Sequence, residues 1–139
     1  MDGWHDINAF AEARELPAIV VYRWEAPLFF ANAGAFRRQI RELARREGTR
    51  WLVLQCEAIT DIDVTAAGVL EQLDNELDAA GVHILFVELR TRLHDLIDRY
   101  GLYATLDRSH FFESIHEALV HVEGAKQAEP DPSGEPPEV

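Results

Sequence analysis

The run from Trp51 to Cys56 is apolar at every position except Gln55, and a polar stretch follows it directly. An apolar run of this length is typical of a strand that is buried on both faces, as in the middle of a parallel sheet. After the polar stretch, apolar residues recur at helical spacing on one stripe: Ala66, Val69, Leu70, Leu73 and Leu77. The sequence therefore predicts a buried strand, a short polar loop and an amphipathic helix, in that order.

The polar loop places Asp61, Asp63 and Thr65 around the predicted start of the helix. The first N–H groups of a helix have no partner within the helix, and the helix dipole leaves partial positive charge there. We expect Asp63 and Thr65 to cap the helix, with a contribution of about 1 kcal/mol each. Thr65 is expected to be exposed at this position.

Other segments repeat the alternation of strand and helix patterns. Strands are predicted at residues 18–24, at 28–30 as a hairpin partner of the first, at 82–87, and at a short edge segment, 102–106. Helices are predicted from an Asn32 cap to Gly48, up to Gly81, from a Thr91 cap to near Gly101, and around the stripe Phe112, Ile115, Leu119 and Val122. This order favours an α/β fold: one mixed, mostly parallel sheet of about four to five strands, packed by four to five helices and joined by right-handed crossovers.

The length of 139 residues fits one domain. Residues 1–16 are interpreted as an N-terminal lead-in and residues 17–124 as the folded domain. Residues 125–139 are acidic and proline-rich with few apolar side chains, so we predict a disordered tail.

Composition narrows the classes of function. A net charge of -12, from 25 acidic and 13 basic residues, disfavours binding to nucleic acid. The sequence contains no apolar stretch as long as the roughly 18 residues of a membrane span, and its first residues are acidic, unlike a signal peptide. The single cysteine, Cys56, is expected to be a small buried side chain in a reducing compartment.

Two segments resemble motifs of a known family. The loop Asp63-Val64-Thr65-Ala66 is similar to the Asp-Ser-Ser-Gly signature of STAS domains, which occur in sulfate transporters and as anti-sigma-factor antagonists. The stretch from Ala26 to Ala33 resembles the corresponding segment of STAS domains attached to SulP-type anion transporters. The resemblance covers about Pro17 to Gly124.

The resemblance implies a STAS-like fold and a regulatory role on the cytoplasmic side of the cell membrane, as part of a sulfate or related anion transporter. The implied partners are the membrane-spanning domain of that transporter and a regulatory protein. It also implies weak binding of GTP, GDP or ATP, with no cofactor required, at the loop before the second helix. The implied nucleotide-binding residues are Thr60, Asp61, Asp63, Thr65, Arg90 and Thr91. No phosphate loop of the Gly-rich type is present and the aspartates repel phosphate, so micromolar or poorer affinity is expected.

The antagonist branch of the family supplies an alternative. There the hydroxyl residue of the loop is phosphorylated by a partner kinase, and Thr65 fills that position. A free-standing anti-sigma-factor antagonist switched at Thr65 therefore remains open, although the segment from Ala26 to Ala33 favours the transporter interpretation.

An enzymatic alternative is a small magnesium-dependent phosphatase, because Asp61-x-Asp63-x-Thr65 also matches the opening motif of haloacid-dehalogenase-like enzymes. That chemistry needs a late cation and further carboxylates. The only lysine is Lys126, in the predicted tail, so Arg90 or Arg92 would have to substitute, and Glu88 alone follows a later strand. The histidines show no metal-binding spacing and the serines no nucleophile elbow. No catalytic residue and no metal site is therefore predicted.

Overall fold

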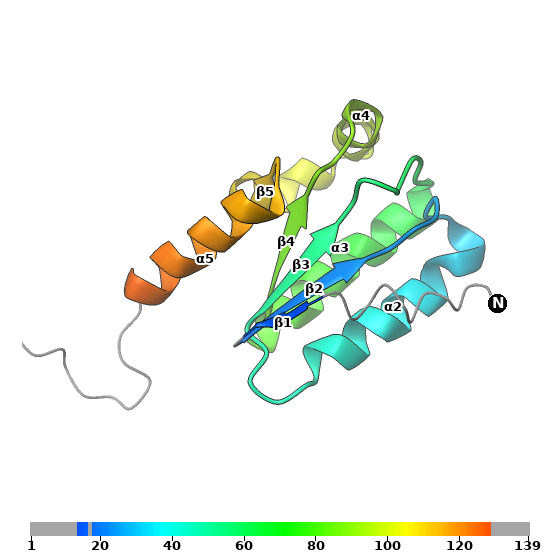
Figure 1. The fold of residues 1–139 in the computed structure, drawn as a ribbon. Coiled ribbons are helices and arrows are strands. Elements are labelled where there is room, and N and C mark those ends of the chain that lie inside the picture. The colour runs from blue at the N-terminus through cyan, green and yellow to red at the C-terminus, as the bar shows by residue number, and fades with distance from the viewer. Residues whose placement is uncertain (1–13, 17, 129–139) are drawn as a thin grey trace, which may run out of the picture.

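The computed structural model describes residues 14–16 and 18–128. Most of the predicted lead-in and most of the predicted tail lie outside these described residues. The described part of the chain forms a sheet with helices on both faces (Figure 1).

The sheet has five strands in the order β1-β2-β3-β4-β5. They are β1 (Arg14–Leu16), β2 (Ile19–Arg23), β3 (Trp51–Gln55), β4 (His83–Val87) and β5 (Phe111–Phe112). β1 pairs with β2 in antiparallel orientation, and every other pairing is parallel. The mixed, mostly parallel sheet predicted from the sequence is thus confirmed, with β3 as its central strand.

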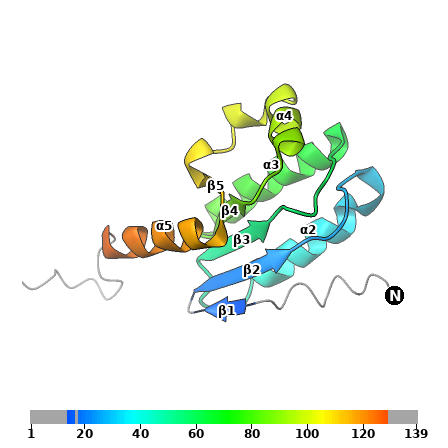
Figure 2. The ribbon, with the colours of Figure 1, turned by 45° about the horizontal axis from the view of Figure 1, so that its top comes forward.

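Four α-helices accompany the sheet within the described residues: α2 (Phe30–Ala44), α3 (Val64–Ala79), α4 (Thr91–Arg99) and α5 (Ile115–Ala128). Two short 3-10 helices, Leu102–Ala104 and Arg108–His110, lie between α4 and β5. α2 and α3 cover one face of the sheet and α5 lies on the other, while α4 stands beyond the carboxyl ends of the strands (Figures 1 and 2). None of the helices in the described part of the chain has the length and hydrophobicity of a membrane span.

The pleat of β3 divides its apolar side chains between two cores. Leu52 and Leu54 pack into the larger core under α2 and α3, and Trp51 and Val53 pack into a smaller core under α5. Leu52 and Val53 have no exposed surface. Full burial of side chains of this size contributes about 1.5 to 3 kcal/mol each, so the central strand is held from both faces.

The prediction of a second strand at residues 28–30 was wrong. Leu28 forms only an isolated parallel bridge to Ile62, and α2 already begins at Phe30. Asn32 is the third helical residue and not the N-cap; its Oδ1 accepts the N–H of Phe29 at 2.9 Å. The apolar side chains suggested a strand, but the two exposed phenylalanines, Phe29 and Phe30, belong to a helix start.

The region around residues 102–106 was also mispredicted. Leu102–Ala104 is a 3-10 helix, and the edge strand is β5, at Phe111–Phe112. Leu102 and Leu106 are buried, which explains why their spacing resembled a strand pattern. On the opposite edge, β1 was not expected.

Helix boundaries differ in smaller ways. Thr91 is the first residue of α4, and Arg90 occupies the N-cap without a side-chain capping bond. α2 ends at Ala44, before Gly48. α5 continues past Gly124 to Ala128, so its last residues belong to a helix and not to the predicted tail.

Candidate functional site

The predicted functional loop connects β3 to α3 at the carboxyl edge of the parallel strands (Figure 1). In sheets of this kind, ligands bind beyond the carboxyl ends of the strands, where loops from neighbouring crossovers meet. The loop from β4 to α4 ends at the same edge, because β3 and β4 are parallel neighbours. The sheet therefore brings the two predicted groups of site residues to one side of the molecule.

Asp63 holds the start of two helices. As N-cap of α3, its Oδ1 accepts the N–H of Ala66 at 2.8 Å. Its Oδ2 accepts the N–H of Phe30, the first residue of α2, at 2.9 Å. Both carboxylate oxygens thus accept backbone N–H groups at the positive ends of helices. The predicted capping role of Asp63 is confirmed, and its link to α2 was not foreseen.

Backbone bonds hold the loop against the segment before α2. The N–H of Leu28 donates to the carbonyl of Asp61 at 2.9 Å, and the N–H of Asp63 donates to the carbonyl of Leu28 at 3.1 Å. The Tyr100 hydroxyl donates to the carbonyl of Ile62 at 3.1 Å. Leu28 and Ile62 are buried below this network. The loop is therefore held in place by backbone bonds, with Thr60, Asp61 and Thr65 exposed.

Thr65 is exposed in the first turn of α3, as expected for a residue accessible to a modifying enzyme. Within the described residues, Asp63 makes the capping bond of α3, and the Thr65 hydroxyl makes none. The second predicted cap is therefore wrong. Because Asp63 already accepts the N–H of Ala66, Thr65 is left as a surface hydroxyl.

The other predicted site residues do not all contact the same partners. Asp61 is exposed; its Oδ1 accepts the N–H of Ile62 at 2.9 Å and contacts Nη2 of Arg92 at 3.4 Å. Arg90 donates from Nε to the carbonyl of Glu57 at 2.9 Å. Thr60 and Thr91 are exposed. The structure thus pairs Asp61 with Arg92, whereas Arg90 binds the start of the loop.

A cavity of about 460 Å³, here called the Asp63 pocket, adjoins this loop. Its lining residues are Pro27, Leu28, Phe29, Asp61, Ile62, Asp63, Arg92, Leu96, Arg99 and Tyr100. Of the predicted nucleotide-binding residues it includes Asp61 and Asp63 only. Its cations are Arg92 and Arg99 of α4; Arg92 was predicted only as a substitute cation of the phosphatase alternative, and Arg99 was not singled out from the sequence. The two arginines are seven residues apart, close to two helical turns, which places both on one face of α4. This spacing is the sequence signal that could have revealed them.

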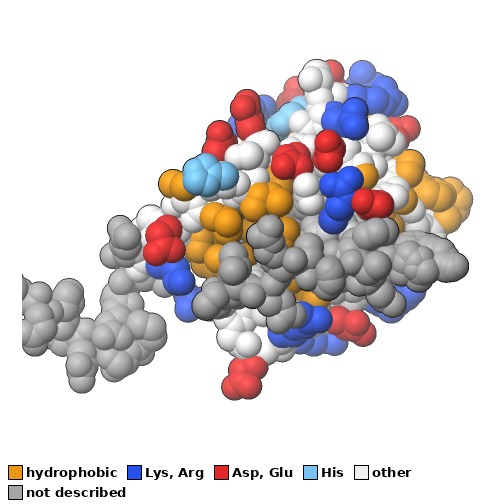
Figure 3. Space-filling model, in the orientation of Figure 1, with side chains coloured by type: hydrophobic (Ala, Val, Ile, Leu, Met, Phe, Trp, Pro, Cys, Tyr) orange, Lys and Arg blue, Asp and Glu red, His pale blue; other side chains and the backbone are white. Residues whose placement is uncertain are grey.

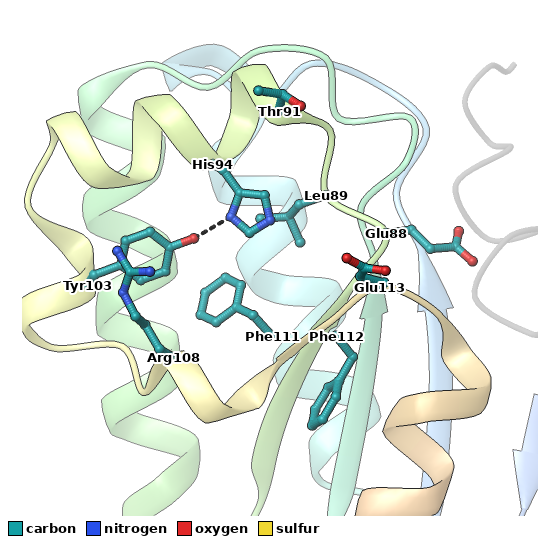
Figure 4. A pocket seen from close by; sticks show the side chains of 9 residues that line it. All are labelled: Glu88, Leu89, Thr91, His94, Tyr103, Arg108, Phe111, Phe112 and Glu113. Carbon is teal, nitrogen blue, oxygen red and sulfur yellow. Dashed lines mark hydrogen bonds between the residues drawn. The ribbon is translucent and has the colours of Figure 1, made fainter.

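A larger cavity, of about 580 Å³, lies on the other side of α4 and is called the His94 pocket (Figure 4). Its lining residues are Glu88, Leu89, Thr91, His94, Tyr103, Arg108, Phe111, Phe112 and Glu113. Thr91 therefore belongs to this pocket and not to the Asp63 pocket. α4 is the wall between the cavities, with Arg92, Leu96 and Arg99 facing one and His94 facing the other.

The polar side chains of the His94 pocket contact one another. His94 Nδ1 and the Tyr103 hydroxyl are 2.5 Å apart, and the Arg108 guanidinium lies 4.0 Å from the centre of the Tyr103 ring. Burial raises the pKa of Tyr103, so its hydroxyl keeps its proton at neutral pH. Glu88 has a φ of 62°, a left-handed conformation that is uncommon outside glycine. Such strain is found preferentially at functional sites.

Two further predictions concern reactive groups. Cys56 is buried, as predicted, and burial raises the pKa of its thiol, so it carries no thiolate at neutral pH. Within residues 14–16 and 18–128, no group of three or more histidine, cysteine or acidic residues is arranged to hold a metal ion. Asp63, which the phosphatase alternative would use as acid or base, accepts two backbone N–H groups.

Exposed apolar side chains lie around Asp63. Phe30 and Val64, the first residues of α2 and α3, are 70% and 66% exposed, and Phe29 is 39% exposed. Hydrophobic atoms gather at the end of the molecule where α2 begins (Figure 3). We call Phe29, Phe30 and Val64 the helix-start patch. Large exposed apolar side chains next to one another are characteristic of contact surfaces.

Comparison with known proteins agrees with this architecture. The family model of the STAS domain matches residues 10–118. The chain belongs to the STAS domain family. A probable sulfate transporter of Mycobacterium tuberculosis is 32% identical over 119 residues, which cover 84% of this chain and 21% of the transporter. The chain thus spans about a fifth of the length of that relative.

Solved structures show the same fold at lower identity. The murine Slc26a9 anion transporter matches with a TM-score of 0.74 at 23% identity, over 84% of this chain and 20% of that protein. The STAS domain of a SulP transporter from Vibrio cholerae matches with a TM-score of 0.67 at 19% identity, over 90% of this chain and 96% of that domain. A putative anti-sigma factor antagonist of Thermotoga maritima matches with a TM-score of 0.69 at 16% identity, over 79% of this chain and 92% of that protein.

Proposed function

We propose that the chain is the regulatory STAS domain of a SulP-type anion transporter and acts by contact with the membrane-spanning part, on the cytoplasmic side. The observation that carries this proposal is the 32% identity to the probable sulfate transporter over most of the chain. Regulation by contact needs no chemistry within the domain. It needs a surface whose geometry is fixed and whose contacts differ between states of the partner.

The helix-start patch supplies such a surface. Phe30 and Val64 are exposed, yet the backbone at both positions is anchored through Asp63, which joins α2 to α3. Exposed aromatic side chains on a rigid base are typical anchors of protein interfaces. We therefore assign the contact to the transporter to this patch.

The test uses the full protein encoded by the reading frame that contains this chain, expressed in bacteria deficient in sulfate uptake. Replacing Phe29 and Phe30 together by serine should lower the maximal rate of labelled sulfate uptake several-fold, at equal membrane abundance. Val120→Ser is the matched control, because Val120 is also exposed, at 58%, but lies on α5. Equal uptake by both variants would overturn the assignment of the patch. A reading frame and operon without membrane-spanning segments would overturn the transporter role itself.

Weak binding of a purine nucleotide is a second part of the proposal. It rests on the Asp63 pocket, where Arg92 and Arg99 supply positive charge for phosphates beside the start of α3. The Asp63 carboxylate is engaged by two N–H groups and Asp61 adds negative charge, so micromolar or poorer affinity is expected. Titration with GTP should give saturable amide shifts at residues 60–65 in wild type and not in Arg92→Ala. Absence of saturable shifts in wild type would reject nucleotide binding.

The antagonist alternative is favoured by one observation, the exposed hydroxyl of Thr65 in the first turn of α3. Two added negative charges there would meet the helix dipole favourably and alter the surface beside Val64. Mass spectrometry of the chain purified from its own cells tests this alternative. Stoichiometric phosphate on Thr65 supports the switch, and an unmodified Thr65 under all growth conditions argues against it.

A further inference from the structure

The His94 pocket has three distinct kinds of surface. Its floor is aromatic: the Phe111 ring lies 5.1 Å from the Tyr103 ring and 6.2 Å from the His94 ring, centre to centre. One side carries the Arg108 guanidinium, and the opposite side carries the Glu113 carboxylate, whereas the Glu88 side chain points away from the aromatic rings (Figure 4). The pocket therefore has aromatic side chains between a cationic end and an acidic end.

The charged groups are available to a ligand. The Arg108 side chain is 68% exposed, and its carboxylate neighbour, Asp98, is 3.9 Å away and 70% exposed, so solvent screens that pair strongly. Glu113 is exposed and its side chain makes no ion pair with the part of the chain that the structure describes. Glu88, which points away, accepts the side-chain amide of Gln55 at 2.7 Å.

The His94–Tyr103 hydrogen bond places polar atoms beside the aromatic rings of the pocket. Nδ1 of His94 and the Tyr103 hydroxyl share this hydrogen bond, so Nε2 is the second polar atom of the imidazole ring. That second nitrogen lies on the Leu89 side of the ring, within the pocket (Figure 4). Glu88 is held in its left-handed conformation by its N–H, which donates to the Phe112 carbonyl at 3.0 Å. The strained residue thus lies at the acidic end of the pocket.

We propose that the His94 pocket binds a small aromatic zwitterion, with its ring against the aromatic side chains, its acidic group at Arg108 and its amino group at Glu113. The volume of about 580 Å³ is within the range of small-molecule sites. This site is separate from the Asp63 pocket and from the helix-start patch, so it does not depend on the proposed transporter role.

The probe for the test is 4-(aminomethyl)benzoate, which carries an amine and a carboxylate at opposite ends of one ring. Its binding to the full chain is followed by amide shifts of residues 88–94 and 103–113. A ligand of this size should bind with a dissociation constant of about 1 mM or lower. Arg108→Ala and Glu113→Gln should each weaken binding about tenfold. Arg45→Ala and Glu47→Gln, at exposed positions at the far end of α2, should leave it unchanged.

Truncated probes separate the features of the site. 4-Methylbenzoate lacks the amine, benzylamine lacks the acid, and 4-(aminomethyl)cyclohexanecarboxylate lacks the aromatic ring. Each should bind more weakly than the parent compound. Binding of any of them as tightly as the parent would overturn the site with a cationic and an acidic end, as would retention of full affinity in Arg108→Ala. Absence of saturable shifts up to about 20 mM of the parent compound would overturn the proposal outright.

Discussion

At the scale of single residues, the Asp63 carboxylate decides how the functional loop is held. Its two oxygens accept one N–H from the start of α3 and one from the start of α2. A neutral or shorter side chain leaves two helix starts, one exposed and one partly buried, without a charged acceptor. Such a residue is unsuited to bind phosphate or metal, because those ligands would compete with its structural bonds.

Asp63→Ala should therefore lower the free energy of unfolding by about 2 kcal/mol, roughly one for each capping bond. Urea denaturation followed by far-UV circular dichroism measures the change. Thr65→Ala is the matched control, since Thr65 is exposed and makes no capping bond, and it should fall within about 0.5 kcal/mol of wild type. A loss no larger in Asp63→Ala than in Thr65→Ala would contradict the double cap.

Asp74 gives the molecule a pH dependence. It is half-buried on α3, and burial, followed by the nearby Asp78 carboxylate, raises its pKa from 3.8 to about 6. A raised carboxyl pKa means that the folded state binds the proton more tightly than the unfolded state. The resulting stabilisation is complete below about pH 4 and is lost as the pH rises through about 6.

Asp74→Asn should therefore raise the free energy of unfolding at pH 7 by about 1 kcal/mol, after allowance for solvent screening, and leave it unchanged near pH 4. Urea midpoints at the two pH values measure the difference. Asp95→Asn, at an exposed position on α4, is the matched control. A larger gain at pH 4 than at pH 7 would have the wrong sign and refute the raised pKa.

At the scale of elements, the turn between β1 and β2 connects the antiparallel edge to the parallel centre. Ala18 adopts a φ of 67° in this turn, and its carbonyl accepts the N–H groups of Arg50 and Trp51 at 2.9 and 3.0 Å. The turn thus also fixes the start of β3. An alanine in the left-handed region is strained, whereas glycine adopts it without a steric penalty.

Ala18→Gly should stabilise the protein by about 0.5 to 1 kcal/mol, because relief of strain exceeds the added entropy of the unfolded chain. A rise in the thermal midpoint measures the effect. Ala26→Gly, outside helices and strands and away from positive φ, serves as the control and should not stabilise. A thermal midpoint that falls in Ala18→Gly would mean that the turn carries no strain.

Elements with strong periodicity were predictable from the sequence, and those set by distant contacts were not. β3, α3 and β4 matched because their apolar patterns extend over a whole element. Leu28 was taken for a strand residue, yet its place is fixed by bonds to Asp61 and Asp63 more than 30 positions away. The His94 pocket escaped prediction for the same reason, because it joins residues from four segments, among them two 3-10 turns that have no regular pattern.

At the scale of the whole molecule, the two faces of the sheet are unequally covered. The larger core lies beneath α2 and α3, whereas the core under α5 is built from Ile19, Val21, Trp51, Val53, Leu85, Val87, Ala118 and Val122. Segments with fewer buried apolar contacts open at lower free energy. We therefore expect α5 to be the least stable of the helices packed on the sheet.

Hydrogen exchange measures this difference directly. Amides in the middle of α5 should exchange with an opening free energy at least about 2 kcal/mol below that of the middle of α3, which should approach the global value. Val122→Ala should lower the value for α5 more than that for α3. Equal protection of the two helices would show that the smaller core is as cooperative as the larger one.

α4 separates the Asp63 pocket from the His94 pocket. Arg92 and Arg99 line the Asp63 pocket, and His94 lines the His94 pocket. The helix has only nine residues, Thr91–Arg99. A displacement of so short a helix changes the shape of both pockets at once. If a ligand in the Asp63 pocket changes the affinity of the His94 pocket by some factor, then a ligand in the His94 pocket must change the affinity of the Asp63 pocket by the same factor.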